Sequence, residues 1–164
     1  MSTTSNKVTV RRAEQGDLEN LRRSEPRPEL ALADRRFKEM TAGSGILAVA
    51  EVDGELAGSG YLDFVDAELR PEVKNLWVYP AFRRRGAGQA LWTWLEQQAR
   101  KAGHDEVFLA VDPNNSKAIP LFVQLGYSAT GDHLLVDDPD SHQVVDPEQV
   151  SNHYAIYRKS LTMN

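Results

Sequence analysis

Two hydrophobic periodicities alternate along the chain and divide it into strands and helices. Apolar residues at every second position are typical of strands, whereas apolar residues three and four apart are typical of helices. These patterns predict strands over residues 8–10, 46–52, 55–65, 73–79, 106–111, 127–136 and 153–159. They predict helices over residues 18–24, 29–40, 87–102 and from 115 or 116 to 125. The order of these elements indicates an α/β (α+β) chain with a mixed sheet and helices on its faces.

Turn and cap residues indicate where three of these elements begin or end. Asp53-Gly54 is a favoured two-residue turn and predicts a hairpin between the second and third strands. Asp17 is a residue type that caps helix N-termini, and Gly103 suits the end of the helix before it. An acidic loop is expected between the last two strands.

Composition limits the chemistry more than it limits the fold. The chain has 164 residues, of which 41% are hydrophobic and 26% charged, and this predicts one globular domain. Cysteine is absent, which excludes disulfides, zinc–thiolate sites and a catalytic thiol. The four histidines lack metal-ligand spacing, so we expect no metal.

The hydropathy and the net charge of the chain also indicate its location and its partners. No apolar run reaches about 18 residues, so we expect no membrane partner. Residues 1–7 lack the apolar segment of a secretory signal, and this favours a cytoplasmic protein. The net charge of −5 argues against nucleic acid as the main partner.

Charge is unevenly distributed along the chain. Residues 118–157 contain no Lys or Arg but six acids, namely Asp132, Asp137, Asp138, Asp140, Asp146 and Glu148. A basic cluster lies upstream at Arg83-Arg84-Arg85. One part of the molecule is therefore expected to attract anions and another to attract cations. The alternative is that both are ordinary solvated surface.

The segment around this basic cluster is where a strand enters a glycine-containing turn and a helix leaves it. Glycines allow positive φ and close backbone approach, and the first N–H groups of a helix face outward with the positive end of its dipole behind them. This predicts an anion site suited to phosphates. The run lacks the Gly-x4-Gly-Lys-Ser/Thr of a Walker loop, and Leu91 stands where the dinucleotide fingerprint needs a small residue. The alternative is a tight turn beside an incidental basic surface.

Two blocks of sequence resemble the GNAT N-acetyltransferase superfamily. Val78-x-Pro80 followed by Arg83-x-x-Gly86-x-Gly88 is similar to its pyrophosphate loop. The run Asn115-x-x-Ala118-x-x-Leu121-Phe122-x-x-x-Gly126-Tyr127 is similar to its second motif. The resemblance implies a single domain over residues 7–161, after a disordered tail at 1–6. It also implies a mixed, mostly antiparallel sheet of about six to seven strands flanked by helices, splayed between the fourth and fifth strands.

The resemblance also implies how acetyl-CoA is held. Backbone N–H groups from Arg84 to Gln89 would bind its pyrophosphate, and the strand Leu76-Trp77-Val78 would pair with pantetheine. The N–H of Trp77 or Val78 would stabilise the oxyanion of the tetrahedral intermediate. The residues expected at the acetyl-CoA site are Leu76, Trp77, Val78, Arg83, Arg84, Arg85, Gly86, Ala87, Gly88, Gln89, Asn115, Ala118 and Phe122.

An amine acceptor must lose a proton before it attacks a thioester, so the reaction needs a base. Glu72 stands where histone-type members of the superfamily place a glutamate and is the first candidate. The alternatives are that Glu72 is an exposed turn residue, or that Asp63, Asp66 or Glu68 takes the role.

The general acid is where the sequence departs from the superfamily, since Phe122 replaces its usual tyrosine. Three explanations stay open. The thiolate leaves unaided and takes a proton from water, because thiols have a pKa near 8.5. Another hydroxyl substitutes, with Tyr79, Tyr127 and Ser116 as candidates. Or catalysis is lost and the domain only binds acyl-CoA.

The function that the resemblance implies is an N-acetyltransferase, which moves an acetyl group from acetyl-CoA to a primary amine by direct attack in a ternary complex. The acidic stretch favours a small cationic acceptor. The alternatives are a protein or peptide N-acetyltransferase and a catalytically degenerate acyl-CoA sensor. The expected partners are acetyl-CoA and the amine acceptor, with a homodimer left open.

Overall fold

The computed structural model describes residues 7–25, 28–65, 69–111, 119–135 and 153–162, and the structural statements below apply to these residues. They form the strands β1 (Val8–Arg12), β2 (Gly45–Val52), β3 (Glu55–Asp63), β4 (Glu72–Val78), β5 (Glu106–Val111), β6 (Ser128–Leu135) and β7 (His153–Ser160). The helices are α1 (Leu18–Ser24), α2 (Leu32–Thr41), α3 (Ala87–Lys101) and α4 (Ile119–Gln124). Short 3₁₀ turns lie at Gln15–Asp17, Pro28–Leu30 and Pro80–Phe82.

The strands form one seven-stranded sheet in the order β1-β2-β3-β4-β5-β7-β6. Every neighbouring pair is antiparallel except β4 and β5, which are parallel. The predicted hairpin between β2 and β3 is confirmed, with positive φ at Asp53 (51°) and Gly54 (86°) as such a turn requires. The mixed, mostly antiparallel sheet expected from the sequence is therefore present.

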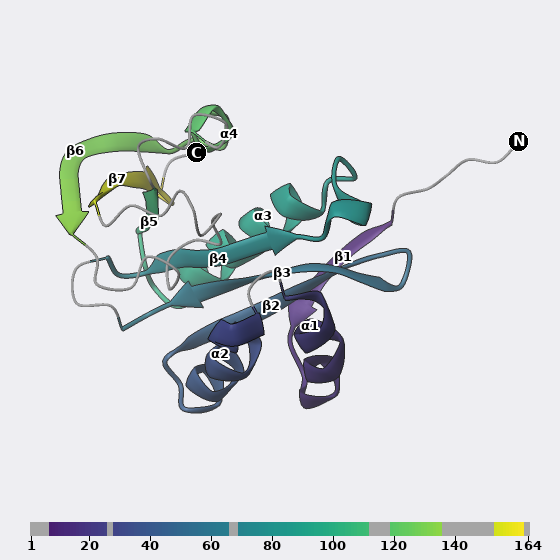
Figure 1. Cartoon of the computed structure of the whole chain (residues 1–164). Helices are drawn as coiled ribbons and strands as arrows, with labels where there is room; N and C mark the ends of the chain where they lie inside the picture. The colour runs from purple at the N-terminus through teal and green to yellow at the C-terminus, as the bar shows by residue number, and fades with distance from the viewer. Residues whose placement is uncertain (1–6, 26–27, 66–68, 112–118, 136–152, 163–164) are drawn as a thin grey trace, which may run out of the picture.

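The sheet divides at the boundary between β4 and β5. Among the described residues these strands pair at Glu72 and Phe108, where the Phe108 N–H also donates to the Pro71 carbonyl (2.9 Å). Beyond that point β4 continues towards Val78 beside β3, and β5 pairs with β7 instead. Figure 1 shows the two halves diverging, with β5, β6, β7 and α4 apart from β1–β4. This is the splay expected between the fourth and fifth strands.

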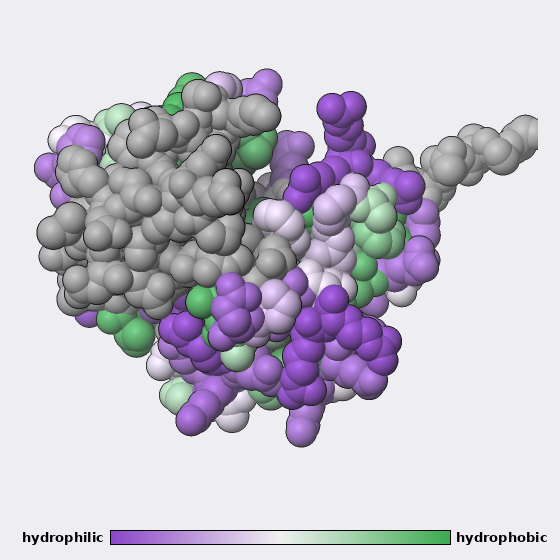
Figure 2. All heavy atoms as spheres, viewed as in Figure 1, coloured by the Kyte–Doolittle hydropathy of each residue, from purple (hydrophilic) through white to green (hydrophobic). Residues whose placement is uncertain are grey.

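Helices cover both faces of the first half of the sheet. Figure 1 shows α1 and α2 on one face and α3 on the opposite face. Leu91, Leu95 and Ala99 repeat at helical spacing along α3 and are buried in the core. The outer surface of α1 and α2 is mainly hydrophilic (Figure 2), so their apolar side chains face the sheet.

Two helix starts differ from the sequence prediction. The predicted helix over 29–40 begins at Leu32 instead, because Ala31 adopts a left-handed conformation (φ 49°) after the turn Pro28–Leu30. Asp17 precedes α1 as expected, but its carboxylate does not cap that helix. It accepts hydrogen bonds from the Glu14 N–H (2.7 Å) and from the guanidinium of Arg11.

Candidate active site

The connection from β4 to α3 presents a row of backbone amides. Arg84 and Gly86 have positive φ (66° and 86°), and the chain enters α3 at Ala87. The first hydrogen bond of the helix runs from the Ala90 N–H to the Gly86 carbonyl (3.0 Å). The amides just before Ala90 therefore lie at the open start of a 15-residue helix, where its dipole favours an anion.

The two glycines of this loop have different surroundings. A Cβ placed on Gly86 would have nothing within 4 Å, so the space beside it is open to a ligand. A Cβ on Gly88 would lie 3.4 Å from Val78 Cγ2, so this glycine packs against the end of β4. Arg83, Arg84 and Arg85 are all exposed around the loop. Open space, outward amides and basic side chains together fit the pyrophosphate of acetyl-CoA.

Arg83 reaches back from the loop to the end of β4. Its Nε donates to the Val78 carbonyl (3.0 Å), and its guanidinium carbon lies 4.8 Å from the centre of the Trp77 ring system. Trp77 and Val78 are both half-buried. Arg83 therefore covers the edge of β4 that the resemblance assigns to pantetheine.

The backbone direction at the end of β4 distinguishes Val78 from Trp77. The Tyr79 N–H donates to the carbonyl of Ala57 in β3 (2.8 Å). Backbone groups of consecutive strand residues point to opposite edges, so Val78 directs its N–H and carbonyl away from β3, into the splay. Of the two candidate oxyanion donors, the geometry favours the Val78 N–H.

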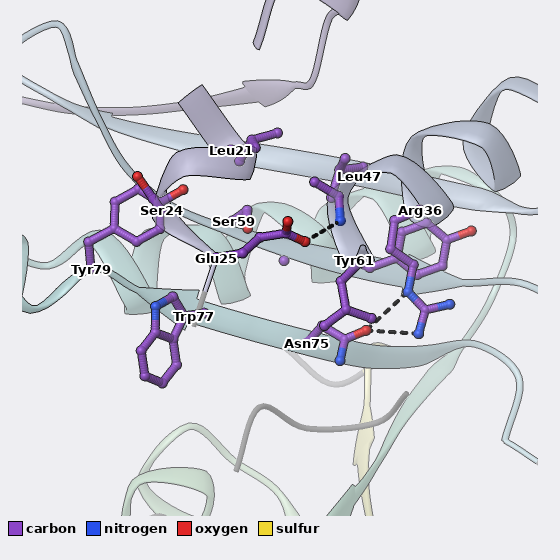
Figure 3. Close-up of a pocket in the computed structure, with 13 residues that line it drawn as sticks. Leu21, Ser24, Glu25, Arg36, Leu47, Ser59, Tyr61, Asn75, Trp77 and Tyr79 are labelled. Atoms are coloured by element: carbon purple, nitrogen blue, oxygen red, sulfur yellow. Dashed lines mark hydrogen bonds between the residues drawn. The ribbon is translucent and has the colours of Figure 1, made fainter. Parts of the chain in front are cut away.

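A pocket lies between α1, α2 and the face of the sheet that α3 does not cover (Figure 3). Its cavity volume is about 40 Å³, and the space rises to about 450 Å³ when the open mouth is included. Most of its wall is apolar side chain and backbone, and Tyr79 closes the end nearest the basic loop. The lining residues are Leu21, Ser24, Glu25, Leu32, Ala33, Arg36, Leu47, Ser59, Gly60, Tyr61, Asn75, Trp77 and Tyr79.

Arg36 is held in this pocket by neighbours from three elements, α2, β3 and β4. Its Nε and Nη2 donate to Asn75 Oδ1 (3.0 and 2.8 Å), and its Nη1 donates to Glu39 Oε1 (2.8 Å). Its guanidinium carbon lies 4.9 Å from the centre of the Tyr61 ring. With only 4% of its surface exposed, Arg36 is a buried cation of fixed orientation.

Glu25 supplies the pocket's carboxylate. Its Oε1 accepts the Ala33 N–H (2.9 Å) and so satisfies an amide at the start of α2. Removal from water raises the pKa of Glu25, and the hydrogen bond from Ala33 opposes this in part. Burial likewise raises the pKa of Tyr79 to about 12, although a hydrogen bond with Ser24 lowers it in part, so its hydroxyl keeps its proton at neutral pH.

Glu72 lies in a buried cluster of charges on the pocket's face of the sheet. It pairs across the sheet with Asp63, and Lys74 pairs with Tyr61 of the pocket wall, which places these residues on one face. Glu72 is 0% exposed, and its Oε1 lies 3.9 Å from Lys74 Nζ. Lys74 Nζ lies 2.7 Å from Asp63 Oδ2. The alternative of an exposed turn glutamate is therefore wrong. Asp66 and Glu68 lie outside the described residues.

The other acid candidates fall into different surroundings. The Tyr127 hydroxyl accepts a hydrogen bond from Trp92 Nε1 (2.7 Å) and donates to Glu96 Oε2 (2.8 Å). Burial raises the pKa of Tyr127 strongly, and these bonds hold its proton within the core. Asn115, Ser116 and Ala118 lie outside the described residues. Of the two tyrosines, only Tyr79 lies at the pocket.

Sequence reasoning missed the polar residues of the pocket, above all Arg36. One signal was available, because Arg36 interrupts the apolar stripe formed by Leu32, Ala33 and Met40 on α2. A charge inside such a stripe is unusual unless it has buried partners. Asn75 gave no comparable signal, because its contact with Arg36 arises only when α2 packs on β4.

The described ranges contain neither a metal-binding cluster nor a membrane-spanning helix. The residues placed there contain no group of three or more His, Asp or Glu side chains that could hold a metal ion. None of the helices placed there is both long and apolar enough to cross a membrane.

Comparisons with known proteins agree on one family. Residues 12–127 match the model of the Acetyltransferase (GNAT) family. A ribosomal-protein-alanine N-acetyltransferase from Brucella melitensis is 17% identical with a TM-score of 0.71, covering 93% of this chain and 99% of that one. A chimeric spermidine N-acetyltransferase from Vibrio cholerae and hSSAT is 18% identical with a TM-score of 0.70 (94% and 96% covered). A GNAT family acetyltransferase from Elizabethkingia anophelis with acetyl-CoA bound is 19% identical with a TM-score of 0.68 (94% and 98% covered). These proteins are similar to this chain in fold, and the first two are named for different acceptors.

Proposed function

The chain belongs to the GNAT acetyltransferase family and is an acyltransferase, and on this premise we propose that it moves the acetyl group of acetyl-CoA to the nitrogen of a primary amine. The observation that carries the proposal is the placement of two openings at one strand end. The amide row of residues 84–89 lies on one side of the end of β4, and the pocket that ends at Tyr79 lies on the other. A donor held at the first and an acceptor held in the second meet beside Val78.

Different residues carry out the successive steps of a direct transfer. The amine nitrogen forms a bond to the thioester carbonyl carbon, and the Val78 N–H stabilises the oxyanion that develops there. The carbon–sulfur bond then breaks and CoA leaves as a thiolate. Glu72 accepts one proton from the ammonium group of the acceptor before the neutral amine attacks; because Glu72 does not line the pocket, this proton passes through water. The nitrogen gives its second proton to water as the amide forms.

The leaving thiolate needs no acid from Phe122. The Tyr79 hydroxyl, with its pKa raised to about 12, is protonated at neutral pH and lies at the donor end of the pocket. We propose Tyr79 or water as the proton source. The loss of one acid typically reduces a rate by about 10²–10⁴-fold and does not abolish it.

The acceptor that fits the pocket is a small amine. Its lining comes from α1, α2 and the sheet, its walls are apolar, and Glu25 offers a carboxylate to an ammonium group. These features support a small molecule over a protein surface. The acidic stretch that favoured a cationic acceptor lies largely outside the described residues, except for Asp132, which is exposed.

Release of CoA thiol in the presence of a panel of primary amines tests the proposal. The chain has no cysteine, so a thiol-reactive dye reports only the CoA product. Thiol release that depends on both acetyl-CoA and the amine, with the acetylated amine found by mass spectrometry, is the expected result. Tight acetyl-CoA binding without turnover on any amine would instead identify an acyl-CoA sensor.

A further inference from the structure

Strand β4 carries one extra residue where it runs beside β3. Gly60 of β3 stands opposite two residues of β4, Asn75 and Leu76, because the register of the pair shifts there. Such an insertion is a β-bulge, which bends a strand and redirects the residues that follow it. Asn75 has a left-handed backbone (φ 53°), a conformation that asparagine adopts more readily than most residues. The bulge therefore lies at Asn75, between the start of β4 and the place of reaction.

The bulge decides which side chains of β4 enter the pocket. Lys74 lies on the pocket's face of the sheet, so regular alternation from Lys74 would turn Trp77 to the opposite face, towards α3. Trp77 instead lines the pocket. Val78 packs towards the start of α3, with its Cγ2 3.4 Å from the position of a Cβ on Gly88. The extra residue thus exchanges the two faces of the strand.

The bulge also decides which backbone groups face the splay. The Pro71 carbonyl accepts the Phe108 N–H and therefore points towards β5. Regular alternation from Pro71 would point the Tyr79 N–H towards β5 as well, and the Val78 N–H towards β3. The Tyr79 N–H instead donates to Ala57 in β3, so the extra residue is what turns the Val78 N–H into the splay.

Arg36 holds this bulge from α2. Its Nε and Nη2 both donate to Asn75 Oδ1 (3.0 and 2.8 Å), and Figure 3 shows these two bonds crossing from the helix to the strand. Its Nη1 donates to Glu39 on the same helix (2.8 Å), which balances the charge of the guanidinium. Arg36 is 4% exposed and Asn75 8%, so water competes little for these bonds. The arginine's donors therefore serve the fold of β4.

We propose that Arg36 is a positioning residue for the transfer, which holds Asn75 in the bulge and thereby aims the Val78 N–H at the oxyanion. The same bulge turns Trp77 and Tyr79 into the acceptor pocket. The proposal rests on the proposed function, because it concerns the oxyanion donor of the same site. An oxyanion donor lowers the barrier only when it is correctly placed, so a relaxed bulge should reduce kcat in a protein that is still folded.

Steady-state kinetics of Arg36→Met test the proposal, with saturating acetyl-CoA and the amine that gives the fastest thiol release in the panel. We expect kcat to fall about tenfold or more at a temperature well below the Tm of the variant. Arg36→Lys keeps a donor and the charge, so it should recover part of this loss. Glu39→Gln is the matched control, because it removes the charge partner but leaves both bonds to Asn75, and its kcat should stay within about threefold. A lower Tm with unchanged kcat in Arg36→Met would reduce Arg36 to a structural role and overturn the proposal.

Substitutions at Asn75 test the bulge itself, even where Arg36→Met does not fold. Asn75→Gly removes the acceptor of the arginine but keeps positive φ accessible, whereas Asn75→Ala removes the acceptor and also disfavours positive φ. We expect kcat to be lower in Asn75→Ala than in Asn75→Gly, and at least about tenfold below the parent in Asn75→Ala. A kcat within about threefold of the parent in Asn75→Ala would overturn the proposal and leave the proposed function intact.

Amide NMR with CoA as the probe keeps the proposal separate from turnover. CoA should shift the Val78 and Gly88 amide signals of the isotope-labelled parent. In Arg36→Met the Gly88 signal, which reports on the basic loop, should still respond, whereas the response of Val78 should be lost. This result supports the proposal even if no amine is acetylated, which would defeat the proposed function alone. A Val78 signal that ignores CoA in the parent, or that responds equally in Arg36→Met, overturns it.

Discussion

The ring of Phe122 packs against Trp92, with 5.2 Å between ring centroids and an interplanar angle of 45°. Phe122 is only 6% exposed, and Trp92 in turn donates its indole N–H to Tyr127. The residue that replaces the family's usual acid is thus part of an aromatic core between α4 and α3. Its neighbourhood explains why a phenyl ring is accommodated here.

Adding a hydroxyl to this ring should cost stability and bring no catalytic gain. In Phe122→Tyr the new hydroxyl enters an apolar contact, which costs about 1–3 kcal/mol when it finds no partner. That corresponds to a fall of roughly 2–10 °C in Tm for a chain of this size. Thermal unfolding measures this, with Phe37→Tyr on α2, a half-buried position, as control. An unchanged Tm together with faster turnover below pH 8.5 would instead place the hydroxyl at the CoA sulfur.

Cofactor affinity should depend on Gly86 through the space beside it. Gly86→Ala combines the strain of positive φ with a Cβ in the open space of the anion site, so we expect acetyl-CoA to bind at least tenfold more weakly, a loss of about 1.4 kcal/mol. Gly54→Ala is the matched control, with the same φ of 86° and nothing within 4 Å of its Cβ. Calorimetric titration and thermal unfolding of both variants separate backbone strain from the blocked space. Strain alone would lower the Tm of both variants and weaken acetyl-CoA binding in neither.

The contact of Arg83 with Val78 and Trp77 predicts an optical signal. If acetyl-CoA pairs with the outer edge of β4, Arg83 must release the Val78 carbonyl and move from the Trp77 ring system. Tryptophan emission should therefore change on titration with CoA, and Trp77→Phe should remove that change while Trp94→Phe keeps it. Because the arginine bonds to its own chain, Arg83→Ala should weaken binding less than about tenfold. A hundredfold loss would mean that its side chain carries the phosphate contact.

Steady-state kinetics should distinguish the role of Glu72 from the role of Glu25. Glu72→Gln keeps the shape of a fully buried side chain but removes the base, so kcat should fall about 10²-fold with acetyl-CoA affinity nearly unchanged. Glu25→Gln keeps an acceptor for the Ala33 N–H and removes the charge that receives the ammonium, so KM for the amine should rise while kcat changes less. A large fall of kcat in Glu25→Gln alone would transfer the role of base to Glu25.

The Arg11–Asp17 pair should contribute to the free energy of unfolding at neutral pH and lose that contribution at low pH. The hydrogen bond from Arg11 is the main cause that lowers the pKa of Asp17. A carboxylate with a depressed folded pKa adds stability above its unfolded value, near 3.9, and loses it as the pH falls through the folded value. Asp17→Asn should therefore cost about 1–2 kcal/mol at pH 7, and its difference from the parent should shrink below about pH 4. Glu19→Gln, in an exposed pair with Arg23, should change little at either pH.

The elements that the sequence predicted well are those with strong local signals. Residues 87–102 were expected as a helix because of their apolar stripe and terminal glycine, and α3 spans Ala87–Lys101. The hairpin at Asp53-Gly54 likewise needs only its own turn geometry. The anion loop belongs to the same group, since a strand, a glycine turn and a helix start are consecutive in the chain.

The pocket could not be predicted in this way because its contacts join distant parts of the chain. Arg36 and Asn75, for example, are 39 residues apart in the sequence. The start of α2 depends on Glu25, whose carboxylate reaches the Ala33 amide across the preceding turn. The burial of Glu72 does not follow from its position after a proline either, because the residues paired with it, Asp63 of β3 and Phe108 of β5, are distant in the sequence.

The position of β7 has a consequence for how this protein is made. It is the last strand in the chain, yet it lies between β5 and β6 and pairs antiparallel with both. Residues 8–101 can assemble β1–β4 and α3 while the ribosome is still translating, whereas β5 waits for a neighbour encoded some 50 residues later. A nascent chain that stops before Tyr154 exposes two strand edges at once, which is a hazard for aggregation. Terminal extensions intended for purification are therefore better placed before Val8 than close after Ser160.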